Sequence, residues 1–154
     1  MKNEFMSRAI ALSIESVQKS GGPFGSLIVK DNKIISEGFN QVTSANDPTA
    51  HGEIVAIRNS CKILNSFSLK GCDLYTSCEP CPMCMSAIYW ARIDNVYYAN
   101  TRDDAKKIDF DDSLIYEQLT KSIKERKIQM TQLMRNEALK AFELWDKKTD
   151  KVKY

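Results

Sequence analysis

The sequence predicts an α/β fold, in which helices cover the faces of a sheet. Three observations lead to this prediction: short apolar runs typical of strands, longer segments with helical spacing, and the alternation of the two along the chain. With 154 residues, 43% of them hydrophobic, the chain fits one domain with one ordinary core. We find no repeat, low-complexity stretch or obvious linker that would divide it.

The first predicted elements are a helix and a hairpin. Apolar side chains recur at helical spacing within residues 4–19, which predicts an amphipathic helix that Gly-Gly-Pro at 21–23 ends. These side chains are Met6, Ile10, Ile14 and Val17. Apolar runs at 26–29 and 34–39 flank the turn-forming segment 30–33, so they predict a pair of strands.

A second helix is expected after a polar loop. Asp47 is its predicted N-cap, Pro48 its predicted first residue, and it should end near Cys61. Residues 72–76 then predict a strand, and Pro82 opens a further helix.

The remaining elements follow the same alternation. Residues 95–99 predict a strand, a helix is expected to begin near Ser113, and a last helix is expected at 136–147. The side chains of this last helix that should face inward are Leu139, Phe142 and either Trp145 or Ala138.

Composition argues against several classes of protein. Basic and acidic side chains number 22 and 20, a balance that does not indicate a nucleic-acid surface. The basic runs at 121–127 and 147–153 are typical of a solvated helix face or tail. The N-terminus lacks the apolar stretch of a signal peptide, and no window approaches the ~20 apolar residues of a membrane span. We therefore expect a cytoplasmic protein whose five cysteines are thiols or metal ligands.

Two short motifs indicate a zinc site. The first, H-G-E, begins at His51, and the second, P-C-P-M-C, contains Cys81 and ends at Cys84. Together they match the H-x-E and P-C-x-x-C pair that is typical of zinc deaminases. Zinc favours imidazole and thiolate ligands, and three protein ligands leave a fourth position open for water, whose pKa the metal lowers. Glu53 is then the expected proton carrier.

The spacing of these residues supports part of this interpretation. Cys81 and Cys84 share one face of the first turn of a predicted helix, where the helix dipole favours thiolates. His51 and Glu53 are two residues apart, so they do not share a face of a regular helix. Periodicity alone therefore does not bring these two side chains to one metal.

Each motif has an ordinary alternative when it is taken alone. C-x-x-C also occurs in redox dithiols and in structural zinc sites, and a single histidine is more often a structural residue than a ligand. A redox dithiol would leave His51 and Glu53 without a role. A structural site usually needs a fourth Cys or His nearby; Cys78 is the candidate, and we expect it to be a buried thiol instead.

Longer segments carry a resemblance to a known family. NDPTAHGEIVAIR at 46–58 and YTSCEPCPMCMSAIYWAR at 75–92 resemble the cytidine-deaminase-like superfamily. More narrowly, GGPFG at 21–25, FDDSLIY at 110–116 and the terminal Tyr154 are similar to bacterial guanine deaminases. The resemblance implies a three-layer α/β/α fold around a central mixed sheet of about five strands.

The resemblance also implies how the chain is assembled. It implies one deaminase domain over residues 1–154 in a homodimer, with a C-terminal segment, about 121–154, that crosses to the partner subunit. Within that segment, residues 121–135 match no part of the family pattern that we can place. One Zn2+ per subunit would be held by His51, Cys81 and Cys84, with Glu53 as the proton shuttle. Gly52 stands where the family usually has alanine.

Carried over position by position, the resemblance implies five substrate contacts. Asn40 would hydrogen-bond the base, and Asp112 would read its donor edge. Phe24 and Trp90 would line the pocket or stack on the base, and the partner's Tyr154 would cap it. Each has an ordinary alternative: the aromatic residues could belong to the core, Asn40 could serve a turn, and Tyr154 could be a frayed terminus.

The implied substrate is guanine, for which Asp112 gives a physical reason. An ionised carboxylate only accepts hydrogen bonds, and guanine offers donors at N1–H and at its exocyclic amine. Adenine and cytosine present a bare ring nitrogen beside the amine that leaves, and a buried mismatch of this kind costs about 1–3 kcal/mol. The alternative is that Asp111 and Asp112 cap the helix expected near Ser113.

Three other functions remain open from the sequence. A tRNA adenosine deaminase acts on a flipped base and usually has a stronger basic surface than this chain. A guanosine or other nucleoside deaminase would use the same zinc motifs. A structural-zinc binding module would need neither an open coordination position nor Glu53.

Overall fold

The computed structural model describes residues 2–154, which form two compact units: the first ends at Asp112 and the second spans Ser113–Tyr154. The elements of the first unit are α1 (Lys2–Gln18), β1 (Gly25–Lys30), β2 (Lys33–Phe39), α2 (Val42–Ala45), α3 (Gly52–Ile63), β3 (Cys72–Cys78), α4 (Pro82–Ala91), β4 (Asn95–Asn100) and α5 (Arg102–Lys106). Those of the second are α6 (Ser113–Thr120), the 3-10 helix η1 (Ile123–Glu125) and α7 (Arg135–Lys147).

The strands of the first unit form one mixed sheet in the order β2-β1-β3-β4. β1 is antiparallel to both β2 and β3, whereas β3 and β4 are parallel. The parallel pair requires a crossover, which α4 provides. The prediction of an α/β fold with a mixed sheet is therefore confirmed.

The expected count of about five strands is wrong, because the described chain forms four. After β4 the backbone turns into α5 instead of continuing to another strand. Thr101 caps α5 by accepting a hydrogen bond from the backbone N–H of Asp104, and the carboxylate of Asp104 accepts from the backbone N–H of Thr101 in return. This capping box starts a helix at the point where the chain leaves the sheet.

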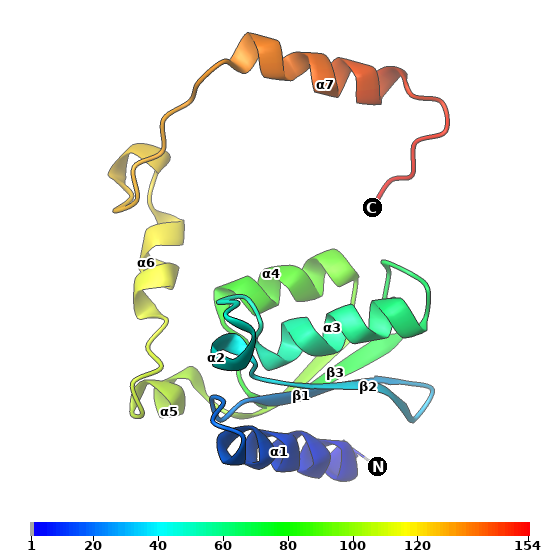
Figure 1. Cartoon of the computed structure of the whole chain (residues 1–154), viewed down its shortest axis with the longest axis vertical. Helices are drawn as coiled ribbons and strands as arrows, with labels where there is room; N and C mark the ends of the chain where they lie inside the picture. Colours follow the sequence, from blue (N-terminus) through cyan, green and yellow to red (C-terminus); the bar gives the residue numbers. More distant parts are fainter. Residues whose placement is uncertain (1) are drawn as a thin grey trace. The chain divides into compact units, whose positions relative to one another are not determined.

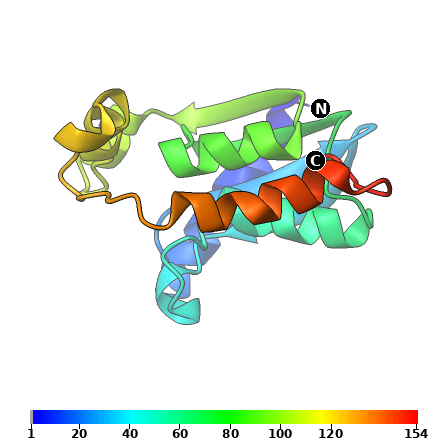
Figure 2. The same ribbon diagram turned by 90° about the horizontal axis from the view of Figure 1, so that it is seen from above.

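Helices cover both faces of the sheet in three layers, as expected. α1 lies on one face, and α3 and α4 lie side by side on the other (Figures 1 and 2). Because successive strand residues point to opposite faces, Leu27 packs beneath α1 and Ile28 packs beneath α3 and α4. β1 is therefore buried on both sides and forms the centre of the unit.

The first helix presents a different face to the sheet from the apolar stripe seen in the sequence. Its buried residues are Ala9, Leu12 and Ser16, whereas Ile14 is 55% exposed and Val17 is 53% exposed. Small side chains at Ala9 and Ser16 let the helix approach the sheet closely. Of the predicted stripe, Met6 packs against the core, whereas Ile10, Ile14 and Val17 are exposed.

The start of α3 also differs from the prediction. His51, not Asp47, is the N-cap, and Pro48 lies outside the helix. The carboxylate of Asp47 instead accepts hydrogen bonds from the backbone N–H and hydroxyl of Thr49, at 2.8 and 2.7 Å. Such a local turn competes with helix formation and delays the helix by several residues.

The second unit contains no buried residue, although all of residues 113–154 are described. α6 begins at Ser113 and α7 covers the expected segment, so both helices are confirmed. The expected inward side chains of α7 are not buried: Phe142 is 74% exposed, Trp145 is 44% exposed, Ala138 is exposed and Leu139 is half-buried. Within residues 2–154 no helix has both the length and the apolar character to span a bilayer.

Candidate active site

The candidate site is built where α3 and α4 begin. His51 is the N-cap of α3 and Cys81 is the N-cap of α4, and both residues have extended backbone. Pro82 follows at the first position of α4, where its missing N–H costs nothing. Since His51 precedes the helix, its side chain does not follow helical spacing, which explains how it can converge with Glu53 although they are only two residues apart.

A close backbone contact fixes the start of α3 on the sheet. A Cβ atom at Gly38 of β2 would overlap the carbonyl oxygen of Gly52, so these two backbones pack directly against each other. At Gly52 itself an added Cβ would lie 3.2 Å from Ser26 Oγ, a tight but not forbidden distance. Glycine in the H-G-E motif therefore gives the Ser26 hydroxyl more room.

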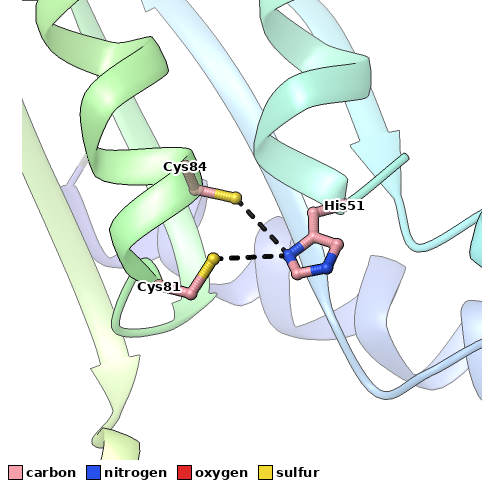
Figure 3. A group of neighbouring side chains, drawn as sticks. All are labelled: His51, Cys81 and Cys84. Carbon is pink, nitrogen blue, oxygen red and sulfur yellow. Dashed lines mark hydrogen bonds between the residues drawn. The ribbon is translucent and has the colours of Figure 1, made fainter. Parts of the chain in front are cut away.

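Three donor atoms converge between the two helix starts. His51 Nδ1 lies 3.6 Å from Cys81 Sγ and 3.5 Å from Cys84 Sγ (Figure 3). All three potential ligand atoms lie within 4.8 Å of one another. A tetrahedral zinc ion with usual Zn–N and Zn–S bonds would separate a nitrogen from a sulfur by about 3.6 Å. The donor set and its spacing therefore fit zinc.

In the absence of a metal, the electrostatics favour a thiolate at Cys81 and a protonated thiol at Cys84. The hydrogen bond from Cys84, and then the one with His51, lower the pKa of the Cys81 thiol to about 4. The hydrogen bond to Cys81, followed by burial, raises the pKa of Cys84. Metal binding requires both groups as thiolates, so it would displace the proton from this cluster.

Glu53 lies beside the three donors and is almost fully buried, with 6% of its surface exposed. Its Oε2 accepts a hydrogen bond from Cys84 Sγ at 3.4 Å, and its Oε1 accepts one from Thr76 Oγ1, also at 3.4 Å. Burial raises the pKa of the Glu53 carboxyl. A carboxyl group in this position can hold and pass on a proton next to the metal donors.

Sequence reasoning missed the hydroxyl groups behind Glu53. Ser26 Oγ donates to Thr76 Oγ1 at 2.9 Å, and Thr76 Oγ1 donates in turn to Glu53. Both residues are at most 1% exposed. Their signal in the sequence would have been hydroxyl side chains inside otherwise buried strands, since buried polar groups are normally hydrogen-bonded.

Phe24 and Asn40 lie next to each other beside the start of α3. The backbone N–H of Asn40 donates to the carbonyl of Phe24 at 3.0 Å, and the buried Asn40 side chain accepts from the N–H of Val42 at 3.2 Å. The carbonyl of Phe24 would be 3.3 Å from a Cβ at Gly52, which places it against the H-G-E motif. The structure therefore brings these two predicted residues to the side of the site.

The segment that ends in Asp112 reaches the same region, since the ring of Phe110 packs edge-on against that of Phe24 with centroids 4.9 Å apart. Burial raises the pKa of the Asp112 carboxyl, the charge of Arg102 lowers it, and the charge of Cys81 raises it. Asp112 also directly precedes α6, so both a capping role and a substrate role stay predictions for its carboxylate.

The remaining predicted contacts lie elsewhere on the chain. Trp90 is 66% exposed in the last turn of α4, at the end of the helix opposite to Cys81, and nine residues of helix span about 13 Å. Tyr154 is the last residue of the second unit and is 70% exposed. Their roles in a pocket stay predictions.

Cys78 is a buried thiol, as expected, and it is not one of the three clustered donors among the described residues. Its Sγ donates to the carbonyl of Thr101 at 3.6 Å. Burial, with a smaller effect from Glu53, raises its pKa to about 11. Such a thiol is a poor metal ligand, which leaves the site with three.

Comparison with known proteins identifies a family and several relatives. The model of the cytidine and deoxycytidylate deaminase zinc-binding region matches residues 1–100. Guanine deaminase of Bacillus subtilis (strain 168) is 50% identical over 151 residues, which cover 97% of each chain. The tRNA-specific adenosine deaminase of Aquifex aeolicus (strain VF5) is 40% identical over 98 residues, 64% of this chain and 65% of the relative.

Solved structures of two guanine deaminases also match this chain. The X-ray structure of guanine deaminase from Bacillus subtilis superimposes with a TM-score of 0.96 at 50% identity, and the match covers 99% of this chain and 98% of that one. Guanine deaminase from Nitrosomonas europaea matches with a TM-score of 0.67 at 28% identity, over 70% of this chain and 63% of that one. The full-length likeness therefore extends through the second unit in one of these relatives.

Proposed function

This chain belongs to the cytidine and deoxycytidylate deaminase family, and from that premise we propose that it hydrolyses guanine to xanthine and ammonia. The observation that carries the proposal is the convergence of His51, Cys81 and Cys84 beside the buried carboxyl of Glu53. The nearly full-length likeness to a guanine deaminase supports guanine over other bases. The likeness to the Aquifex aeolicus tRNA deaminase covers only about two thirds of either chain.

The deaminase domain is a zinc-binding one, and His51, Cys81 and Cys84 are the residues that would hold one zinc ion per subunit. Zinc with three protein ligands supplies an acidified water at its open position. With zinc bound, Glu53 would accept a proton on its carboxylate and would deliver protons to the base and to the departing ammonia. Thr76 holds Oε1 of Glu53, so Oε2 remains on the side of the metal donors.

Recognition of guanine is assigned to the residues beside the helix starts. The ionised carboxylate of Asp112 matches the donor at N1–H, where adenine and cytosine have a bare nitrogen. Asn40 hydrogen-bonds the base, and Phe24 provides an apolar wall that Phe110 supports edge-on, with ring centroids 4.9 Å apart. Trp90 and the partner's Tyr154 would complete the pocket.

A homodimer, with the segment of about 121–154 crossing between cytoplasmic subunits, is the proposed assembly. Its support is the exposed apolar surface of the second unit, where Phe142 and Leu144 are 74% and 72% exposed. Removing residues 151–154 should lower turnover at least tenfold while leaving zinc content unchanged, because Tyr154 would cap the partner's site. Sedimentation would give the oligomeric state, and an unchanged rate would remove Tyr154 from the pocket.

A substrate panel tests the function directly. Purified protein with one equivalent of zinc would be offered guanine, guanosine, cytosine, cytidine, adenine and a tRNA anticodon stem-loop, and ammonia release would be measured for each. We expect the highest kcat/KM with guanine. A higher value with the stem-loop or with a nucleoside would replace the proposal with one of those activities, and zinc binding without any ammonia release would favour a structural-zinc module.

A further inference from the structure

Arg102, the first residue of α5, connects the loop before Cys81 to Asp112. Its guanidinium Nη2 lies 3.3 Å from Asp112 Oδ1. Its backbone N–H donates to Glu79 Oε2 at 3.0 Å, and Glu79 stands two residues before Cys81. One residue therefore contacts both the approach to the metal donors and the carboxylate proposed to read the base.

Hydrogen bonds around Thr101 fix the backbone at the start of α5, where Arg102 lies. The backbone N–H of Glu79 donates to the carbonyl of Asn100 at 2.8 Å. Thr101, between Asn100 and Arg102, caps α5 together with Asp104. These bonds fix the start of α5 to the end of β3, so the Arg102 side chain extends from a rigid base.

The segment that ends in Asp112 depends on side-chain contacts to keep its place. Phe110 packs edge-on against Phe24. Asp111 pairs with Lys106 at 3.1 Å, and the Lys106 and Asp111 side chains are 56% and 43% exposed. The Arg102–Asp112 pair is the better shielded of the two ion pairs, at 32% and 19% exposure. A shielded pair constrains geometry more than an exposed one, which is screened by water.

We propose that Arg102 is a positioning residue for substrate specificity, which holds the Asp112 carboxylate in place to accept hydrogen bonds from guanine. This inference rests on the proposed function, because it acts on the residue that would read the base. A carboxylate has about four acceptor sites, so the pair with Arg102 at Oδ1 leaves sites for N1–H of the substrate. The planar guanidinium suits this task, since it carries its charge at any relevant pH.

The charge on Arg102 also keeps Asp112 an acceptor. Burial raises the pKa of the Asp112 carboxyl, and the charge of Arg102 opposes this rise. A protonated Asp112 would present an O–H donor toward the N1–H donor of guanine. Without Arg102 the carboxylate would lose both its orientation and part of its preference for guanine.

The test compares three variants with the wild-type holoenzyme. In Arg102→Gln, KM for guanine and Kd for the product xanthine, which keeps N1–H but has no amine to lose, should both rise roughly 10- to 100-fold, the range for a lost hydrogen bond to a charged group. Zinc content and Tm should stay at the wild-type values. Arg102→Lys should recover most of the loss, because it retains the charge. Lys106→Gln, on the same helix and paired with the neighbouring carboxylate Asp111, is the matched control and should change KM less than about twofold.

A double-mutant cycle shows whether Arg102 acts through Asp112. In an Asp112→Asn background, Arg102→Gln should cause little further loss, because the residue it positions has already changed. A wild-type Kd for xanthine in Arg102→Gln, or full additivity of the two changes, would overturn the inference. The proposed function would still stand if the wild type deaminates guanine. A wild type that does not deaminate guanine would overturn both.

Discussion

The two units of this chain differ in where they keep their apolar side chains. In the first unit, residues such as Leu27, Ile28 and Leu74 are fully buried between the sheet and its helices. In the second unit no residue is buried, and large apolar side chains such as Phe142 are exposed. A 13-residue helix such as α7 is marginal in water on its own, so its stability must come from packing.

This difference teaches that the metal donors and their scaffold belong to one unit, while the other unit has no buried core of its own. The three donors and Glu53 all lie on elements with a complete hydrophobic core. The exposed apolar surface of the second unit is of the kind that marks an interaction site. Substitutions in each unit test whether metal binding and stability depend on the first unit and self-association on the second.

The largest effect is expected from removing a metal ligand in the first unit. Cys84→Ala should abolish zinc binding and with it deamination, and it should lower Tm, because metal binding is coupled to folding. Zinc content by elemental analysis and the thermal transition are the measurements. Cys61→Ala, a half-buried thiol outside the donor cluster, is the control that should keep its zinc. Equal zinc occupancy in the two variants would contradict the ligand assignment.

A loss of activity without loss of zinc is expected from Glu53→Gln. General acid–base catalysis contributes about 10²- to 10⁴-fold to rate, so kcat should fall by that factor. Zinc content and fold should remain, because Glu53 is not among the three clustered donors. Glu143→Gln, on an exposed position of α7, should leave kcat unchanged. Full activity in Glu53→Gln would mean that another group carries the protons.

Two large-to-small substitutions compare how much a side chain of each unit contributes to the free energy of unfolding. Leu74→Ala, at a site with 0% exposure, should lower the free energy of unfolding by about 2–5 kcal/mol. Phe142→Ala, at a site with 74% exposure, should change the stability of the single chain by less than about 0.5 kcal/mol. It should instead weaken self-association, which sedimentation would detect. Equal losses of stability at low protein concentration would show that the second unit packs within one chain.

The smallest effect concerns the ion pair that ties α1 to β2. Arg8 donates to both oxygens of Glu37 at 2.7 Å, and this hydrogen bonding lowers the pKa of Glu37 below its ordinary value of 4.5. A lowered folded-state pKa means that the ionised pair stabilises above pH 4.5 and that the contribution is lost as pH falls through the folded-state value. Both side chains are about a third exposed, so the contribution is at most about 1 kcal/mol.

Urea unfolding of wild type and Glu37→Gln would measure this contribution at two pH values. The difference in stability between the two proteins should be present at about pH 7 and should shrink toward about pH 3. Glu143→Gln is again the control, because its side chain lies at an exposed position of α7. If the difference in stability between wild type and Glu37→Gln grew as the pH fell, the ionised pair would not be its source.

Particular residues separate what the sequence predicts from what it leaves open. The strands, the helix at Pro82 and the donors His51, Cys81 and Cys84 were predictable, because strand and helix spacing and ligand chemistry are local properties of the chain. The start of α3 was not predictable, because the Asp47 side chain accepts a hydrogen bond from Thr49 and forms a turn before the helix. The buried face of α1 was not either, since close packing at Ala9 and Ser16 outweighed the apolar stripe.

By itself the sequence determined the residue types at the metal site and the order of the elements. Both follow from local properties, namely the chemistry of the side chains and the periodicity of apolar residues. Only the tertiary structure decided that His51 caps a helix and so meets Glu53, that Thr76 and Ser26 stand behind that carboxyl, and that Arg102 pairs with Asp112. Most of these contacts join residues far apart in the chain. Such pairs are set by the packing of whole elements against one another, which no local pattern encodes.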